Sequence, residues 1–163
     1  MRCPFVISSD IPTLHGTKLS SRYLARIEGR KALAYSETKR PVVLIVEDEY
    51  LIRMDAADMI GAAGFDVVEA RNADEAIAIL ERRFDISVVF TDVQMPGSMD
   101  GLKLAAAVRD RWPPIKIVAT SGLNIGEGEL PRGSRFLRKP YNTAEIVGTL
   151  RQVTGADGEA GIA

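Results

Sequence analysis

Cysteine, aromatic residues and long apolar runs are all scarce in this chain of 163 residues. Its single cysteine, Cys3, cannot form a disulfide within the chain, which fits a reducing compartment. No apolar run approaches the roughly 20 residues that a membrane-spanning helix needs, and the apolar stretch near the start is too short for a secretory signal. We therefore expect a cytoplasmic protein that does not insert into a membrane.

A large excess of charge of either sign is also lacking, because 21 Lys and Arg face 22 Asp and Glu. The balance is uneven along the chain, since residues 1–40 contain eight basic and three acidic residues. The remainder is acidic, which argues against a globally basic nucleic-acid-binding protein. We expect no direct contact with nucleic acid.

The chain divides into three parts by pattern. Residues 1–40 show only a weak helical pattern, and we predict a loosely ordered basic extension; the alternative is a docking or dimerising helix over 21–34. Across 41–153, short apolar runs alternate with helical patterns, which predicts an α/β domain with a parallel sheet and helices on both faces. Residues 154–163 are small and polar, and we predict a flexible tail.

The pattern within 41–153 predicts five strands and four clear helices. The strands are expected at 42–46, 66–69, 88–92, 115–120 and 136–138. The helices are expected at 50–63, 73–80, 101–111 and 143–153, the third with Leu102, Ala105, Ala106 and Val108 facing the core. The segment 123–135 carries three glycines and a proline, so it is a poor helix.

Side chains with reactive chemistry stand at the ends of four predicted strands. They are the acidic pair Glu47 and Asp48, the carboxylate Asp92, the hydroxyl of Ser121 and the ammonium of Lys139. The carboxyl edge of an open α/β sheet is where ligands bind. Each residue alone would more often be a turn or loop former, but their joint occurrence at strand ends predicts a functional site.

Three carboxylates and one ammonium leave this cluster negative, so a cation is expected to join it. Oxygen ligands favour Mg²⁺, which one or two carboxylates typically hold; Asp48 and Asp92 would supply these, with a backbone carbonyl from just beyond Asp92, while Glu47 would act mostly through water. There is no Cys/His set for zinc and no nucleotide-binding phosphate loop. The partner of the ion is therefore expected to be a small phosphoryl group.

Asp92 is the expected nucleophile, because it ends the most central strand. A carboxylate can attack phosphorus and form an acyl phosphate. Phosphoryl transfer mainly needs positioning and charge neutralisation, which Mg²⁺ and Lys139 would provide, and the hydroxyl of Ser121 could bond to a phosphoryl oxygen.

These motifs resemble the receiver domain of two-component response regulators (CheY-like). The matching pieces are Val42–Asp48, Thr91–Pro96, Asp100-Gly101, Thr120–Gly122 and Lys139–Tyr141. The resemblance implies a doubly wound, flavodoxin-like sheet of five parallel strands in the order 2-1-3-4-5. It also implies a stand-alone phosphorylation-controlled module, a monomer or weak dimer, with an output partner that the sequence does not name.

The resemblance further assigns roles at the site. Asp92 would accept phosphate from a histidine kinase or phosphotransfer protein, and the backbone carbonyl of Gln94 would complete the Mg²⁺ ligands. Ser121 and Lys139 would sense the phosphoryl group, and Phe136 stands where the family has its switch aromatic. The segment 123–135 departs from the family, which predicts a shortened or irregular fourth helix.

Two other functions compete with this reading. A Mg²⁺-dependent phosphohydrolase with an aspartyl-phosphate intermediate would need an acid/base two residues after its nucleophile. Gln94 occupies that position and cannot transfer protons in that way. A degenerate receiver used only for protein contacts is disfavoured, because competent residues fill all the site positions.

Overall fold

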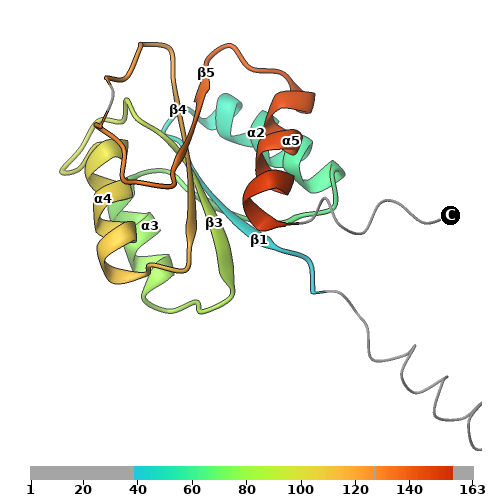
Figure 1. Ribbon diagram of the computed structural model, residues 1–163, viewed down its shortest axis with the longest axis horizontal. Coiled ribbons are helices and arrows are strands. Elements are labelled where there is room, and N and C mark those ends of the chain that lie inside the picture. Colours follow the sequence, from blue (N-terminus) through green and yellow to red (C-terminus); the bar gives the residue numbers. More distant parts are fainter. Residues whose placement is uncertain (1–38, 127, 156–163) are drawn as a thin grey trace, which may run out of the picture. The chain divides into compact units, whose positions relative to one another are not determined.

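The structure, a computed structural model, describes residues 39–126 and 128–155. They form a five-stranded parallel sheet in the order β2-β1-β3-β4-β5, flanked by helices (Figure 1). The strands are β1 (Val42–Val46), β2 (Asp66–Ala70), β3 (Ile86–Asp92), β4 (Lys116–Ser121) and β5 (Arg135–Arg138). The helices are α2 (Tyr50–Ala62), α3 (Ala73–Leu80), α4 (Gly101–Arg111) and α5 (Thr143–Thr154). The predicted α/β class and strand order are confirmed.

The basic extension, its alternative docking helix over 21–34 and nearly all of the predicted tail lie outside the described residues. The division of the chain at 40 and 153 therefore stays a prediction. Within the described ranges, no helix combines the length and the apolar character that crossing a membrane requires.

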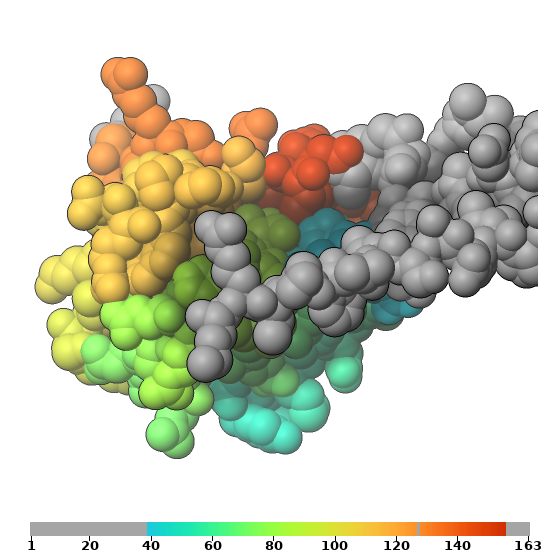
Figure 2. Space-filling model, turned by 90° about the horizontal axis from the view of Figure 1, so that it is seen from below, coloured from blue at the N-terminus to red at the C-terminus, as the bar shows by residue number. Residues whose placement is uncertain are grey.

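Helices cover both faces of the sheet, and each face has its own hydrophobic core. On one face α3 and α4 lie side by side, as Figures 1 and 2 both show. Their core includes Leu44, Val46, Val89, Leu80, Leu104 and Ile117. On the other face α2 and α5 pack over Val43, Ile45, Val88, Val118, Ile60, Ile146 and Leu150. All of β1 is buried, as expected for a central strand covered on both faces.

The core face of α4 differs in part from the prediction. Ala105 and Val108 are buried as expected, but Ala106 is exposed and Leu102 only half-buried, whereas Leu104 is fully buried. The buried positions 101, 104, 105 and 108 follow the spacing of a single helical stripe. Apolar character alone did not identify this stripe, because the sequence offers small or apolar residues on several sides of the helix.

Asparagine side chains and a glycine mark several helix ends. At α5, Asn142 accepts a hydrogen bond from the Glu145 amide and Glu145 accepts one from the Asn142 amide, which is a complete capping box. At α3, Asn72 caps the helix in the same way, but the carboxylate of Glu75 accepts from the Arg71 amide instead. Gly64 follows α2 with a φ of 94°, the left-handed conformation expected there.

The connection between β4 and β5 contains no helix in its described residues, 122–126 and 128–134. Gly128 and Gly133 have positive φ, and Leu130 packs against the core beside α4. The prediction of an irregular segment is therefore confirmed. The helix that the receiver family places here is replaced by turns and bends.

Candidate functional site

The predicted site residues meet at the carboxyl edge of the sheet. Glu47 follows β1, Asp92 ends β3, Ser121 ends β4 and Lys139 follows β5. Because all five strands are parallel, these ends share one edge. The sequence prediction that four strand ends converge is borne out by this topology.

Three carboxylates form a compact cluster at this edge. Glu47, Asp48 and Asp92 each offer an oxygen, and these oxygens lie within 4.8 Å of one another. Glu47 and Asp92 are only 4% and 6% exposed, and Asp48 is half-buried. Carboxylates this close and this buried disfavour simultaneous ionisation unless cations join them.

Lys139 is the cation that the structure places in the cluster. Its Nζ lies 2.8 Å from Oε2 of Glu47, to which it donates a hydrogen bond, and 3.0 Å from Oδ1 of Asp92. The contact with Asp92 is an ion pair, and Oδ1 of Asp92 is buried without a hydrogen bond in the described part of the chain. One ammonium thus links the first, third and last strands.

The pKa values show that this ammonium does not fully compensate the cluster. Burial raises the pKa of Glu47, and the hydrogen bond from Lys139 opposes this shift without cancelling it. Burial alone would lower the pKa of Lys139, but Glu47 and Asp92 outweigh it, so that pKa is raised. Lys139 therefore stays charged, while burial opposes the ionisation of Glu47.

The donor set of the cluster fits a hard metal ion. All three candidate ligands are carboxylates, and oxygen ligands of this kind suit Mg²⁺ or Ca²⁺ rather than a soft metal. The buried Oδ1 of Asp92 is paired with the Lys139 ammonium but makes no hydrogen bond in the described part of the chain, and a carboxylate oxygen has a second lone pair that a cation can use. These residues could therefore hold a metal ion.

Arg53 supports the cluster from α2, and sequence reasoning did not identify it. Its Nη1 donates to the backbone carbonyl of Glu47 at 2.6 Å, and its Nε pairs with Glu69 on β2 at 3.2 Å. The amide of Glu49 also donates to the Glu47 carboxylate, at 3.3 Å. An arginine six residues after an acidic residue has no recognisable motif, so this contact needed the fold.

Ser121 and Lys139 are joined through the backbone, but the Ser121 hydroxyl faces its own loop. The amide of Lys139 donates to the Ser121 carbonyl at 2.8 Å. The hydroxyl is buried and accepts a hydrogen bond from the Leu123 amide at 3.0 Å. In the resting structure this hydroxyl is therefore engaged with the segment that follows β4.

Two further predicted positions lie outside the carboxylate cluster. Gln94 is exposed in the loop after β3, two residues beyond Asp92. Phe136 lies on β5 opposite Ala119 of β4 and is 37% exposed. The Lys139–Pro140 peptide is cis.

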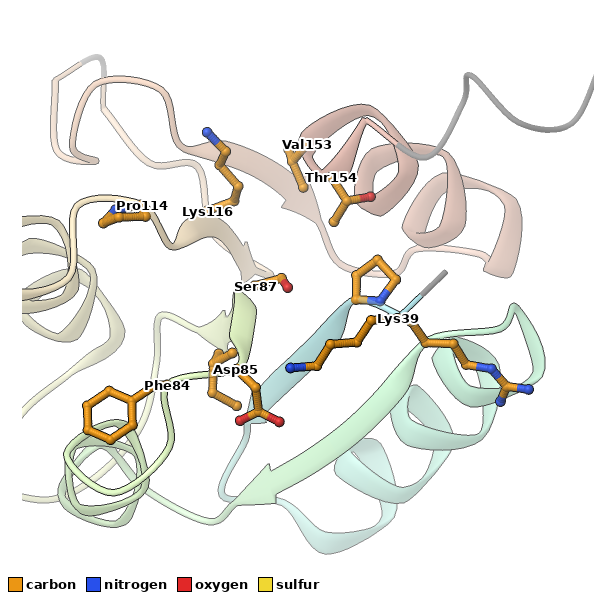
Figure 3. Close-up of a pocket in the computed structure, with 11 residues that line it drawn as sticks. Lys39, Phe84, Asp85, Ser87, Pro114, Lys116, Val153 and Thr154 are labelled. Carbon is orange, nitrogen blue, oxygen red and sulfur yellow. The ribbon is translucent and has the colours of Figure 1, made fainter. Parts of the chain in front are cut away.

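A hollow at the amino edge of the sheet does not coincide with this chemistry. It measures about 440 Å³ and is lined by Lys39, Asp85, Ser87 and Lys116 among others (Figure 3). Another hollow, of about 370 Å³, adjoins the site and is lined by Lys139, Pro140 and Tyr141 with residues of α2. We place the site at the carboxylate cluster, because charge and burial converge there and not at the amino edge.

The family model described as "Response regulator receiver domain" matches residues 43–151, a span that contains every site residue discussed above. This chain belongs to the response-regulator receiver family. Receiver domains are signalling modules of two-component systems, so the predicted family and the general signalling role are confirmed.

Relatives among curated proteins support this assignment. The sensor kinase CckA of Brucella abortus is 33% identical over 116 residues, which cover 68% of this chain and 12% of the kinase. The transcriptional regulatory protein PdtaR of Mycobacterium tuberculosis is 31% identical over 128 residues, covering 72% of this chain and 62% of PdtaR. The chain thus spans less than two thirds of the length of these relatives.

Solved structures show the same fold. A response regulator receiver protein from Sinorhizobium medicae is 26% identical, with a TM-score of 0.68 and coverage of 74% of this chain and 98% of that one. The chemotaxis protein CheY4 of Vibrio cholerae is 27% identical, with a TM-score of 0.64 and coverage of 71% and 99%.

Proposed function

We propose that this receiver accepts a phosphoryl group on Asp92 from the phosphohistidine of a histidine kinase or phosphotransfer protein. The observation that carries the proposal is the buried Asp92 carboxylate, with an ammonium 3.0 Å away and two more carboxylates within 4.8 Å. This arrangement holds a nucleophile beside the positive charge that phosphoryl transfer requires. The site would operate in the cytoplasm, where a kinase can reach it.

The transfer is a displacement at phosphorus. An oxygen of the Asp92 carboxylate forms the new P–O bond as the P–N bond of the phosphohistidine breaks. The imidazole leaves with the electron pair of the P–N bond. If its other ring nitrogen already carries a proton, the ring leaves neutral; otherwise it takes up one proton from solvent. Lys139 balances charge on the phosphoryl oxygens from its place beside Asp92.

Mg²⁺ is the cofactor that we assign to the carboxylate cluster. Asp48 and Asp92 would bind it directly, with the backbone carbonyl of Gln94, and Glu47 would act mostly through water. When bound, the ion neutralises the phosphoryl oxygens and the cluster together.

Ser121 and Phe136 are the proposed switch residues. The Ser121 hydroxyl now accepts from the Leu123 amide, and it would exchange this bond for one to a phosphoryl oxygen on Asp92. This exchange would let Ser121 and the start of the β4–β5 connection move inward, and part of the connection would become ordered. Phe136, half-exposed on the neighbouring strand, would repack and change the surface offered to an output protein.

The phosphohydrolase alternative is not favoured. Gln94 stands where such an enzyme needs its acid/base, and the family match is to receivers. Multiple turnover of free phosphoesters by the purified protein would nevertheless revive it.

The decisive experiment uses acetyl phosphate with Mg²⁺ and intact-protein mass spectrometry. We expect a gain of one phosphoryl group, none in Asp92→Asn and little without Mg²⁺. Asp110→Asn is the matched control, because Asp110 is an exposed carboxylate on α4, and it should label like the parent. Full labelling of Asp92→Asn would falsify the assignment.

A further inference from the structure

The first residue of α4 packs against the main chain of the phosphoacceptor. Gly101 is buried, and its amide donates to the Val93 carbonyl at 3.0 Å. Asp100 caps the same helix by accepting from the Lys103 amide at 2.8 Å. The start of α4 is thereby fixed to the loop that leaves β3.

No side chain fits at position 101. A Cβ there would lie 2.0 Å from the carbonyl oxygen of Asp92 and 2.7 Å from Cα of Val93, whereas real Cβ contacts are essentially never shorter than 3.0 Å. Both atoms belong to the backbone, so no flexible side chain can yield. Gly101 does not have positive φ, so the requirement is for space and not for an unusual conformation.

A hydroxyl group holds the same carbonyl. Oγ1 of Thr91, which is fully buried, donates to the Asp92 carbonyl at 2.9 Å. The amide of Val93 donates to the Thr120 carbonyl of β4 at 2.8 Å. The peptide after Asp92 is thus held by β4, by Thr91 and by the bare Cα of Gly101.

We propose that Gly101 and Thr91 are positioning residues that set the attack geometry of the Asp92 carboxylate. This inference rests on the proposed function of Asp92. To bring the Cβ of an alanine at 101 from 2.0 Å to at least 3.0 Å, α4 and the Asp92 peptide must separate by about 1 Å. A misplacement of about 1 Å can cost roughly 100-fold in rate.

The test compares the labelling rates of variants across acetyl phosphate concentrations in Mg²⁺, well below each melting temperature. Gly101→Ala should lower the maximal rate about 100-fold, because geometry and not donor binding is altered. The concentration giving half the maximal rate should change little. Thr91→Val, which removes one hydrogen bond, should lower the maximal rate roughly two- to tenfold.

Gly61→Ala is the matched control. Gly61 is also helical, on α2, but a Cβ there has no neighbour within 4 Å, so its rate should equal that of the parent. A merely structural role for Gly101 predicts a lower melting temperature with an unchanged maximal rate, and that result would overturn the proposal.

Two possible failures of this experiment have their own tests. If Gly101→Ala does not fold, Thr91→Val decides alone, and a parental rate in that variant rejects the inference. If the parent takes up no phosphate, the proposed function fails first. The geometry is then tested by comparing the amide NMR shifts of Gly101→Ala with those of the parent. Unchanged shifts of Asp92 and Val93 would be sufficient to reject the positioning role of Gly101.

Discussion

At the level of single residues, the site depends on one ammonium shared by two buried carboxylates. Lys139 contacts both Glu47 and Asp92, and neither carboxylate is more than 6% exposed. Removing carboxylates from water is costly, and a single ammonium offsets this cost only in part. The part of the cost that Lys139 does not offset raises the pKa of Glu47.

This imbalance predicts how stability depends on pH in the absence of Mg²⁺. Because folding raises the pKa of Glu47 above its ordinary value of 4.5, its contribution to stability is present below that pH and is lost as pH rises through the folded pKa. Glu47→Gln removes this titration. The unfolding free energy of the parent minus that of Glu47→Gln should therefore fall as pH rises above 4.5.

Urea unfolding at a series of pH values measures this difference. Asp58→Asn is the control for the loss of one carboxylate, since Asp58 is exposed on α2. A Glu47 difference that grows with pH would mean that the Lys139 ion pair outweighs burial.

At the level of elements, the capping box of α5 predicts a measurable loss of stability. Asn142 and Glu145 satisfy each other's amides, and α5 carries Ile146 and Leu150 into the core. Asn142→Ala should lower the free energy of unfolding by about 1 kcal/mol. Urea unfolding tests this, with the exposed neighbour Thr143→Ala as control; equal losses in both variants would deny the cap its role.

The segment between β4 and β5 is the element expected to respond to phosphate. It has no helix in its described residues and is held to the site by the Leu123 amide on Ser121. If Ser121 turns toward a phosphoryl group, part of the segment should become ordered, which is a known form of switching. Hydrogen exchange should show weak protection at 123–135 that increases with beryllofluoride; strong protection unchanged by the mimic would contradict this.

The sequence was sufficient for most elements, because their signals are local. The glycines in 123–135 act on their own neighbours, and the structure agrees with the predicted irregular segment. The sequence also predicted that Glu47, Asp92 and Lys139 lie at one edge of the sheet, since the carboxyl ends of parallel strands share an edge.

The sequence does not predict contacts that form only when elements distant in the chain pack together. Arg53 reaches the Glu47 carbonyl only after α2 docks on the sheet. Leu104 and not Leu102 enters the core because it lies on the same buried side of α4 as Gly101. Neither residue carries a spacing signal that would single it out.

At the level of the whole molecule, the domain is expected to fold without the basic extension. β1 is the first strand of the described residues, and those residues form both hydrophobic clusters. Deleting residues 1–40 should leave the melting temperature and phosphate uptake nearly unchanged. Calorimetry and light scattering test this; a melting temperature lower by several degrees or a new oligomeric state would indicate a docking or dimerising helix.

The salt bridge between Glu47 and Lys139 joins residues 92 positions apart, one directly after the first strand and one directly after the last. During synthesis, Asp92, the proposed acceptor, is made well before Lys139. Under the proposed function, a chain truncated before its last strand should therefore take up little phosphate, because its Asp92 would lack the Lys139 ammonium. Completion of the domain during translation would then be a condition for phosphate uptake.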